Sequence, residues 1–169
     1  FPKTLKSLTT SGFSSPRIFV DGDNDSVSWE KEFGFPTTVR PKPELYVVGN
    51  WILSMWELYV RNPLADRFAL FQDDFVCVRN LKAYLERKPY PDKGYLNLIT
   101  FPSNHRIAPK EKGWFQAGLC SVDTQFQTGR GAVALVFNRE AVQVLLGSRS
   151  LADKPAEARR PRKAIDGAI

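Results

Sequence analysis

The amino-acid sequence predicts an α/β fold in which helices cover both faces of a central sheet. Three observations lead to this prediction. Strand-like apolar runs alternate with segments of helical spacing along the chain. Several runs contain no polar residue, as in residues 132–137 (AVALVF), and such strands are covered on both faces. The 169 residues are enough for one domain with its own core and too few for two, so residues 1–169 are expected to form a single domain.

The N-terminal elements are expected to be a helix and a short strand. Leu5 and Leu8 lie at helical spacing within residues 2–12, and Gly12 is the expected C-terminal stop of that helix. Residues 17–20 (RIFV) then form a short strand, which runs directly into an acidic loop. The first strand of the sequence therefore ends in carboxylates.

A longer helix and a second strand are expected next. Residues 33–44 are rich in proline and are expected to be loop. Residues 49–60 follow as a helix whose apolar residues recur at i, i+3, i+4 and i+7, and an Asn-Pro pair ends it. Residues 68–71 (FALF) form the next strand by their length and context.

The later part of the chain is expected to continue the alternation. Residues 80–86 form a short helix with Asn80 as its N-cap, and residues 95–99 form a strand. The apolar strand 132–137 leads into a helix over residues 141–146, which ends at a glycine. This order of elements is typical of an open α/β sheet, in which ligands bind at the carboxyl ends of the strands.

The positive charge of the chain is concentrated in one segment. The formal net charge is +6, and residues 154–163 (KPAEARRPRK) hold five basic residues and one acid, a net +4. A nucleic-acid interface needs basic residues spread over a face with aromatic side chains between them, so nucleic acid is not expected as a partner. The segment is interpreted as a solvated loop, with a flexible basic loop near a phosphate-bearing ligand as the alternative.

The cysteines and the chain ends bear on the compartment and on the extent of the protein. Cys77 and Cys120 lie in apolar segments without a Cys-x-x-Cys pair, which predicts buried thiols in a reducing compartment, with pairing of the two cysteines as the alternative. No apolar stretch approaches the roughly 20 residues of a membrane-spanning helix. The chain starts at Phe1, without Met, and stops at Ile169 in an apolar-looking stretch, so it is expected to be part of a longer protein.

Two neighbouring carboxylates follow an apolar strand in the stretch 68–75 (FALFQDDF). Asp73 and Asp74 repel each other and are costly to desolvate there. A divalent cation would remove both penalties, and hard oxygen ligands suit Mg²⁺ or Mn²⁺. The sequence therefore predicts a metal site at the end of this strand, with a purely structural pair of acids as the alternative.

A second acidic cluster follows the first strand. It consists of Asp21, Asp23 and Asp25. Asp residues also favour plain turns because they hydrogen-bond their own backbone. The cluster is therefore interpreted either as a turn or as a contact to a nucleotide, and Asp21, which is closest to the strand end, is the better functional candidate.

Other site chemistries are not expected. His105 is the only histidine, so neither a His-based metal site nor a Ser-His-Asp triad is predicted. Gly129 and Gly131 match no phosphate-loop pattern, because neither a Gly-Lys-Ser/Thr ending nor a helix follows them directly. These glycines are interpreted as a tight bend or a close approach of the backbone to a ligand.

Taken in their order and spacing, five segments carry a resemblance to a known family: residues 4–13 (TLKSLTTSGF), 17–25 (RIFVDGDND), 68–75 (FALFQDDF), 129–146 (GRGAVALVFNREAVQVLL) and 162–169 (RKAIDGAI). With them the chain resembles nucleotide-sugar-dependent glycosyltransferases of the GT-A fold. The resemblance covers roughly residues 3–169. It implies a Rossmann-like catalytic domain with a mixed central sheet and helices on both faces.

The resemblance also implies roles for five acids. Asp74 would hold Mn²⁺ or Mg²⁺ at the diphosphate of the donor, and Asp73 would contact the metal or the ribose. Asp21 and Asp23 would lie near the nucleoside. Asp166 would be the general base for the acceptor hydroxyl, or alternatively an acid placed at a helix N-terminus.

The implied activity is a metal-dependent hexosyl- or N-acetylhexosaminyl-transfer. The donor would be a nucleotide sugar, a UDP-sugar in first place, and the acceptor a hydroxyl of a glycan, lipid or protein. Gln72 departs from the family pattern, since an acid often precedes the acidic pair. An inactive binding or scaffold domain is therefore one alternative. A sugar-phosphate nucleotidyltransferase that uses the same acids is another. The resemblance leaves the cytoplasm and the Golgi lumen open as compartments.

Overall fold

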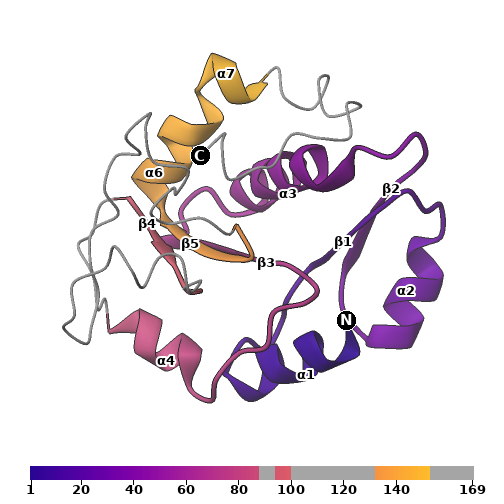
Figure 1. Cartoon of the computed structure of the whole chain (residues 1–169), viewed down its shortest axis with the longest axis horizontal. Helices are drawn as coiled ribbons and strands as arrows, with labels where there is room; N and C mark the ends of the chain where they lie inside the picture. Colours follow the sequence, from indigo (N-terminus) through magenta and orange to yellow (C-terminus); the bar gives the residue numbers. More distant parts are fainter. Residues whose placement is uncertain (88–93, 100–131, 153–169) are drawn as a thin grey trace, which may run out of the picture.

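A computed structural model gives the structure of the chain and describes residues 1–87, 94–99 and 132–152. The described part is built from small sheets and surrounding helices (Figure 1), which confirms the α/β class. Its elements in chain order are α1 (Pro2–Thr10), β1 (Ile18–Asp21), α2 (Ser26–Phe33), β2 (Thr37–Arg40), α3 (Tyr46–Arg61), β3 (Arg67–Phe71), α4 (Leu81–Glu86), β4 (Tyr95–Asn97), β5 (Ala134–Asn138), α6 (Arg139–Leu146) and α7 (Arg149–Ala152).

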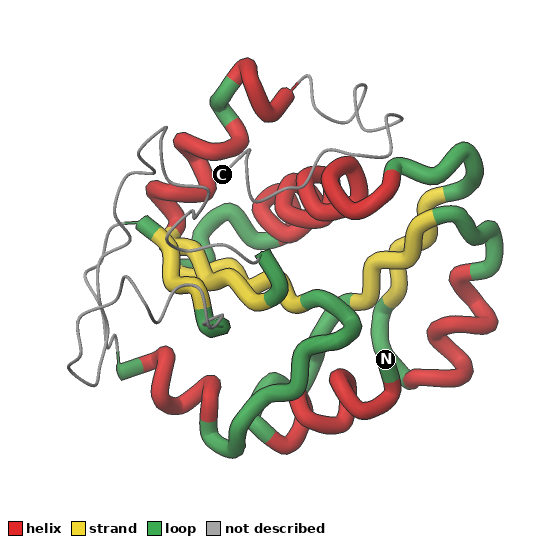
Figure 2. The backbone as a smooth tube through the Cα atoms, viewed as in Figure 1, coloured by secondary structure: helices red, strands yellow, loops and turns green. Residues whose placement is uncertain are grey.

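The described strands form two small sheets, where the sequence predicted one central sheet. β1 and β2 pair in parallel, with Ile18 opposite Thr37. β3 and β4 both pair antiparallel with β5, which lies between them. β1 pairs only with β2, and β3 pairs only with β5. No described strand therefore joins the two sheets (Figure 2).

Helices cover both faces of the three-stranded sheet, as expected. On one face, residues of α3, α6 and α7 pack on Leu135 and Phe137. On the other face, residues of α1 and α4 pack on Val136. This alternation follows from the two-residue period of a strand, and it explains why β5 carries no polar residue before Asn138.

Helix α3 is the longest described helix and connects the two sheets. Its buried residues include Trp51, Ile52 and Met55, which lie on the predicted apolar stripe. The helix begins at Tyr46, three residues before the predicted start, and ends at Arg61 before the Asn-Pro pair. None of the described helices has the length and apolar character that crossing a bilayer requires.

The prediction that residues 33–44 form a loop is wrong. Residues Thr37–Arg40 form β2, whose β-branched side chains favour a strand once β1 is beside them. Proline at either end masked this short strand in the sequence. Helix α2 was also missed, because it buries no residue completely and so has no clear apolar stripe. The short helix α7 was not predicted either.

Helix α2 depends on a side-chain cap at its first turn. The carboxylate of Asp25 accepts a hydrogen bond from the backbone N–H of Ser28 at 2.9 Å. We expect Asp25→Ala to lower the free energy of unfolding by about 1 kcal/mol, the usual cost of losing such a cap. Urea unfolding followed by circular dichroism measures this loss.

The matched control for this prediction is Asn24→Ala. Asn24 is exposed, and its hydrogen bond to Asp23 is donated by its backbone N–H, which the substitution keeps. Its substitution should change the stability by less than about 0.5 kcal/mol. Equal losses in the two variants would show that the cap does not stabilise α2.

Candidate functional site

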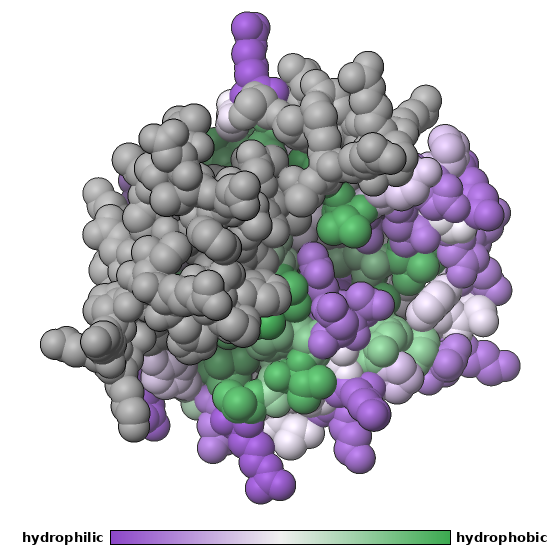
Figure 3. Space-filling model, in the orientation of Figure 1, coloured by the Kyte–Doolittle hydropathy of each residue, from purple (hydrophilic) through white to green (hydrophobic). Residues whose placement is uncertain are grey.

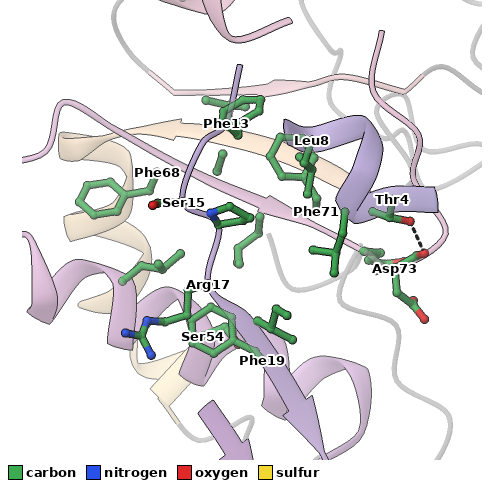
Figure 4. Close-up of a pocket in the computed structure, with 18 of the residues that line it drawn as sticks. Thr4, Leu8, Phe13, Ser15, Arg17, Phe19, Ser54, Phe68, Phe71 and Asp73 are labelled. Carbon is green, nitrogen blue, oxygen red and sulfur yellow. Dashed lines mark hydrogen bonds between the residues drawn. The ribbon is translucent and has the colours of Figure 1, made fainter. Parts of the chain in front are cut away.

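A large cavity lies between the two sheets. Its volume is about 1020 Å³, and α1, β1, α3 and β3 all contribute to its wall. Apolar side chains such as Leu8, Phe68 and Phe71 line much of it (Figure 4). In the space-filling view, apolar surface also lies open between hydrophilic side chains in the lower half of the molecule (Figure 3). The cavity is therefore large enough to enclose a ligand or another segment.

Two acidic candidate residues line this cavity. Asp21 is the last residue of β1, and Asp73 follows β3 after Gln72. Both line the cavity, and Figure 4 shows Asp73 beside Thr4 at the edge of the labelled residues. The fold therefore brings together two candidate residues that are separated by some fifty positions in the sequence.

One carboxylate oxygen of Asp21 is hydrogen-bonded to the backbone at the start of α3. Its Oδ1 atom accepts a hydrogen bond from the backbone N–H of Leu45 at 3.0 Å. No described residue donates a hydrogen bond to its Oδ2 atom. One carboxylate oxygen thus holds the loop after β2, and the other is available to a ligand.

Asp23 is held in its own turn and does not line the cavity. Its carboxylate accepts hydrogen bonds from the indole N–H of Trp29 at 2.7 Å and from the backbone N–H of Asn24 at 2.6 Å. The hydrogen bond from Trp29, followed by the one from Asn24, lowers the pKa of Asp23. These contacts give Asp23 a structural role in the turn before α2.

Asp73 and Asp74 are both exposed, but only Asp73 lines the cavity. The hydroxyl of Thr4 donates a hydrogen bond to the backbone carbonyl of Asp73, which ties the start of α1 to the acidic turn (Figure 4). Neither carboxylate makes a hydrogen bond or ion pair with another described residue. Both are therefore accessible to a cation from solvent.

Among the described residues, no further metal-binding side chain joins Asp73 and Asp74 in a group of three. Within residues 1–87, 94–99 and 132–152, no three His, Cys, Asp or Glu side chains form a metal-holding group. Two adjacent carboxylates fit Mg²⁺ or Mn²⁺ in kind, because these ions take few protein ligands and complete their shell with water and phosphate oxygens. Asp166, the candidate general base, lies outside the described residues, as do His105, Cys120 and the basic segment 154–163.

The structure also contains a charged network that the sequence did not reveal. Glu57 on α3 pairs with Arg61 at 2.8 Å, with Arg17 at 3.6 Å and with Arg40 at 3.8 Å. The hydroxyl of Thr38 donates a hydrogen bond to the same carboxylate at 2.7 Å. Only the Glu57–Arg61 pair, at i and i+4 of a helix, has a signal in the sequence.

Arg40 is the buried member of this network. It is 9 % exposed, and its guanidinium lies over the ring of Phe19 at 5.2 Å from the ring centre. It also donates hydrogen bonds to the side chains of Asn50 and Ser54, both of which line the cavity. Burial lowers the pKa of Arg40, and the carboxylates of Glu57 and Asp21 oppose this effect. The network thus joins β1, β2 and α3 into one wall of the cavity.

Cys77 is buried, as predicted, beside α1. Its backbone N–H donates a hydrogen bond to the hydroxyl of Ser7 at 2.9 Å. Burial raises the pKa of its thiol, although hydrogen bonds with Ser11 and Ser7 oppose the shift. A buried thiol of raised pKa is a core residue and a poor nucleophile.

No model of a known protein family, no curated protein and no solved structure matches this chain.

Proposed function

We propose that the chain belongs to a glycosyltransferase of the GT-A fold, which moves a sugar from a nucleotide-sugar donor to a hydroxyl acceptor. The observation that supports this proposal most is that Asp21, the last residue of β1, and Asp73, which lies just after β3, line one cavity. Ligands of α/β proteins bind at such strand ends. Acidic side chains there suit a donor that carries ribose hydroxyls and a metal-bound diphosphate.

Asp73 and Asp74 are the residues that would hold the divalent cation. Their carboxylates are exposed and adjacent, and no described side chain neutralises them. Bound Mn²⁺ or Mg²⁺ would supply charge stabilisation to the diphosphate leaving group. Asp73 also reaches the cavity, so it can position the cation at the cavity end.

Asp21 would orient the nucleoside. Its Oδ2 atom can accept a hydrogen bond from a ribose hydroxyl while Oδ1 stays fixed by Leu45. Asp166 is proposed as the base that removes the proton of the acceptor hydroxyl. The basic segment 154–163 is proposed to lie near the phosphates, in keeping with its net charge of +4.

One observation favours a second candidate, a domain that binds the donor without turnover. Gln72 lines the cavity next to Asp73. Its neutral amide offers a weaker metal ligand than the acid that often stands in the family at this place. Metal binding would then be weaker, and donor binding would survive better than catalysis.

An assay of nucleoside diphosphate release tests the proposal. UDP-, GDP- and CDP-sugars are incubated with the chain, with and without Mn²⁺, and in the presence of sugar acceptors. We expect release from one donor that requires Mn²⁺ and that falls by about 100-fold or more in Asp73→Asn and Asp74→Asn.

The matched control is Glu32→Gln, which makes the same chemical change on the exposed surface of α2. This variant should retain the activity of the unchanged chain. Mn²⁺-dependent binding without release would favour the second candidate. Equal release by Asp73→Asn, Asp74→Asn and the unchanged chain would contradict the assignment of the metal site.

A further inference from the structure

The acid that ends β1 lies on the face of its sheet that α3 covers. Residues two apart in a strand point to the same face, so Phe19 and Asp21 share one face of β1. Their partners in the parallel strand β2 are Thr38 and Arg40. Glu57 of α3 meets both partners, at 2.7 Å from the hydroxyl of Thr38 and at 3.8 Å from the guanidinium of Arg40. Asp21 thus shares this face with the cation of Arg40.

The guanidinium of Arg40 is held in one position by several contacts. Its Nη1 atom donates hydrogen bonds to the side chains of Asn50 and Ser54, and its central carbon lies over the ring of Phe19. The amide of Asn50 in turn donates a hydrogen bond to the backbone carbonyl of Phe19 at 3.4 Å. The positive charge is therefore fixed relative to the end of β1.

A buried arginine is a costly way to hold this wall of the cavity together. Arg40 is 9 % exposed, and an apolar side chain of similar size would avoid the desolvation of a charge. Its charge is also only partly balanced, because its ion-pair partner Glu57 is shared with Arg17 and Arg61. The other carboxylate that attracts Arg40 is that of Asp21. The charge that Glu57 leaves uncompensated therefore acts on the acid at the end of β1.

Asp21 is fixed through one of its two carboxylate oxygens. Its Oδ1 atom accepts the hydrogen bond from the backbone N–H of Leu45, and the described residues form no ion pair with this carboxylate. Arg40 therefore attracts the carboxylate from within the sheet face and does not occupy Oδ2. A carboxylate that is hydrogen-bonded at one oxygen and attracted from one side has one preferred orientation.

We propose that Arg40 is a positioning residue for Asp21, whose carboxylate it holds so that Oδ1 stays on Leu45 and Oδ2 faces the ribose of the donor. This inference rests on the proposed function, in which Asp21 orients the nucleoside. Arg40 is assigned no contact with the donor. Its charge acts across the pair of strands, and the contacts of its guanidinium keep that charge in place.

Two substitutions in the same network separate positioning from stability. Arg40→Met removes the charge beside Asp21, whereas Glu57→Gln removes the ion-pair partner of Arg40 and leaves that charge in place. Both should destabilise the fold. The nucleotide among UDP, GDP and CDP that binds the unchanged chain is titrated in Mn²⁺ at a temperature at which both variants are folded. We expect Arg40→Met to weaken binding by about tenfold or more and Glu57→Gln to change it by less than about twofold.

The ribose supplies a readout that a purely structural role would not move. The 2′,3′-dideoxy form of the same nucleotide lacks the hydroxyls that Oδ2 of Asp21 would bind. The unchanged chain and Glu57→Gln should prefer the ribose form by about tenfold, and this preference should be lost in Arg40→Met. Arg40→Lys, which keeps the charge, should restore part of the preference. Arg40→Gln removes the charge but keeps a donor for Asn50, and it replaces Arg40→Met if that variant does not fold.

Hydrogen exchange tests the position of Asp21 without any nucleotide. The amide of Leu45 should exchange at least about tenfold faster in Arg40→Met, because its acceptor is no longer held in place. The amide of Gly22 is the internal control, since it donates to the backbone carbonyl of Arg40 at 2.8 Å and the substitution keeps this bond. The ratio of the two exchange rates thus removes the general loss of stability.

The possible outcomes separate this inference from the proposed function. Equal losses of affinity in Arg40→Met and Glu57→Gln, with an unchanged ribose preference, would overturn the inference and leave the proposed function standing. Equal acceleration of the Leu45 and Gly22 amides would also overturn it, because Arg40→Met would then only loosen the sheet. If the unchanged chain binds none of the three nucleotides, the proposed function and the ribose contact fail together. The exchange of Leu45 then still decides whether Arg40 positions Asp21.

Discussion

Phe137→Ala is expected to lower the free energy of unfolding by about 3–5 kcal/mol, as is typical for truncation of a fully buried aromatic side chain. Phe137 is 1 % exposed and lies in β5, the central strand of its sheet. Its ring meets Trp51 edge-on at 5.7 Å and stacks on Tyr95 at 5.2 Å. The substitution therefore removes aromatic contacts with a helix and a strand and leaves a cavity. Urea unfolding monitored by circular dichroism measures the loss.

Val144→Ala is the control for this substitution. Val144 lies on α6, near the same core, but is 72 % exposed. Its truncation should cost less than about 0.5 kcal/mol. A loss below about 1 kcal/mol for Phe137→Ala would contradict the placement of Phe137 at the centre of the core.

Glu57→Gln is expected to cost about 2 kcal/mol, the second largest effect. The Glu57 side chain is 20 % exposed and pairs with three arginines, of which Arg40 is buried. The substitution removes the main charge partner of the buried Arg40 and leaves only the weaker attraction of Asp21 in a partly desolvated place. The exposed pair between Glu86 and Lys82 provides the control, because Glu86→Gln should cost no more than about 0.5 kcal/mol. Equal costs would show that burial adds nothing to the network.

The same carboxylate makes stability depend on pH. Burial by itself would raise the pKa of Glu57, but hydrogen bonds from Thr38 and Arg61 and the charges of Arg61 and Arg17 outweigh it and lower the pKa below its ordinary value of 4.5. A carboxyl whose folded pKa is depressed stabilises the fold fully above its unfolded pKa. This contribution is lost as the pH falls through the folded pKa.

Unfolding free energies measured from neutral pH down to about pH 3 test this dependence. The unchanged chain should lose stability more steeply in the acid range than Glu57→Gln, which has no proton to bind at this position. Parallel pH profiles for the two proteins would show that Glu57 has the same pKa in the folded and unfolded states.

The sequence predicted those helices and strands whose own residues show a clear apolar pattern and a clear end. Helix α1 has its apolar pair and a terminal glycine, and β3 and α6 have apolar runs with clear ends. β2 could not be predicted in this way, because four residues between prolines become a strand only through pairing with β1. The division into two sheets was also hidden, since register and pairing are long-range properties.

The candidate site was predictable in part. The acids at the ends of β1 and β3 were identified from the change from apolar to acidic residues, and the structure brings Asp21 and Asp73 to one cavity. The sequence did not show that Asp74 lies off the cavity wall or that Asp23 is held by Trp29. The sequence also did not show that Glu57 forms ion pairs with Arg17 and Arg40, because these residues lie far apart along the chain.

Calorimetric titration of the chain with UDP, GDP and CDP, in Mn²⁺ and again in EDTA, tests the proposed donor site most directly. We predict that one of the three nucleotides binds, that EDTA weakens its binding by about tenfold or more, and that Asp74→Asn has the same effect as EDTA. Glu32→Gln should bind like the unchanged chain. The contradicting result is the absence of metal-dependent binding for all three nucleotides in a chain that circular dichroism shows to be folded.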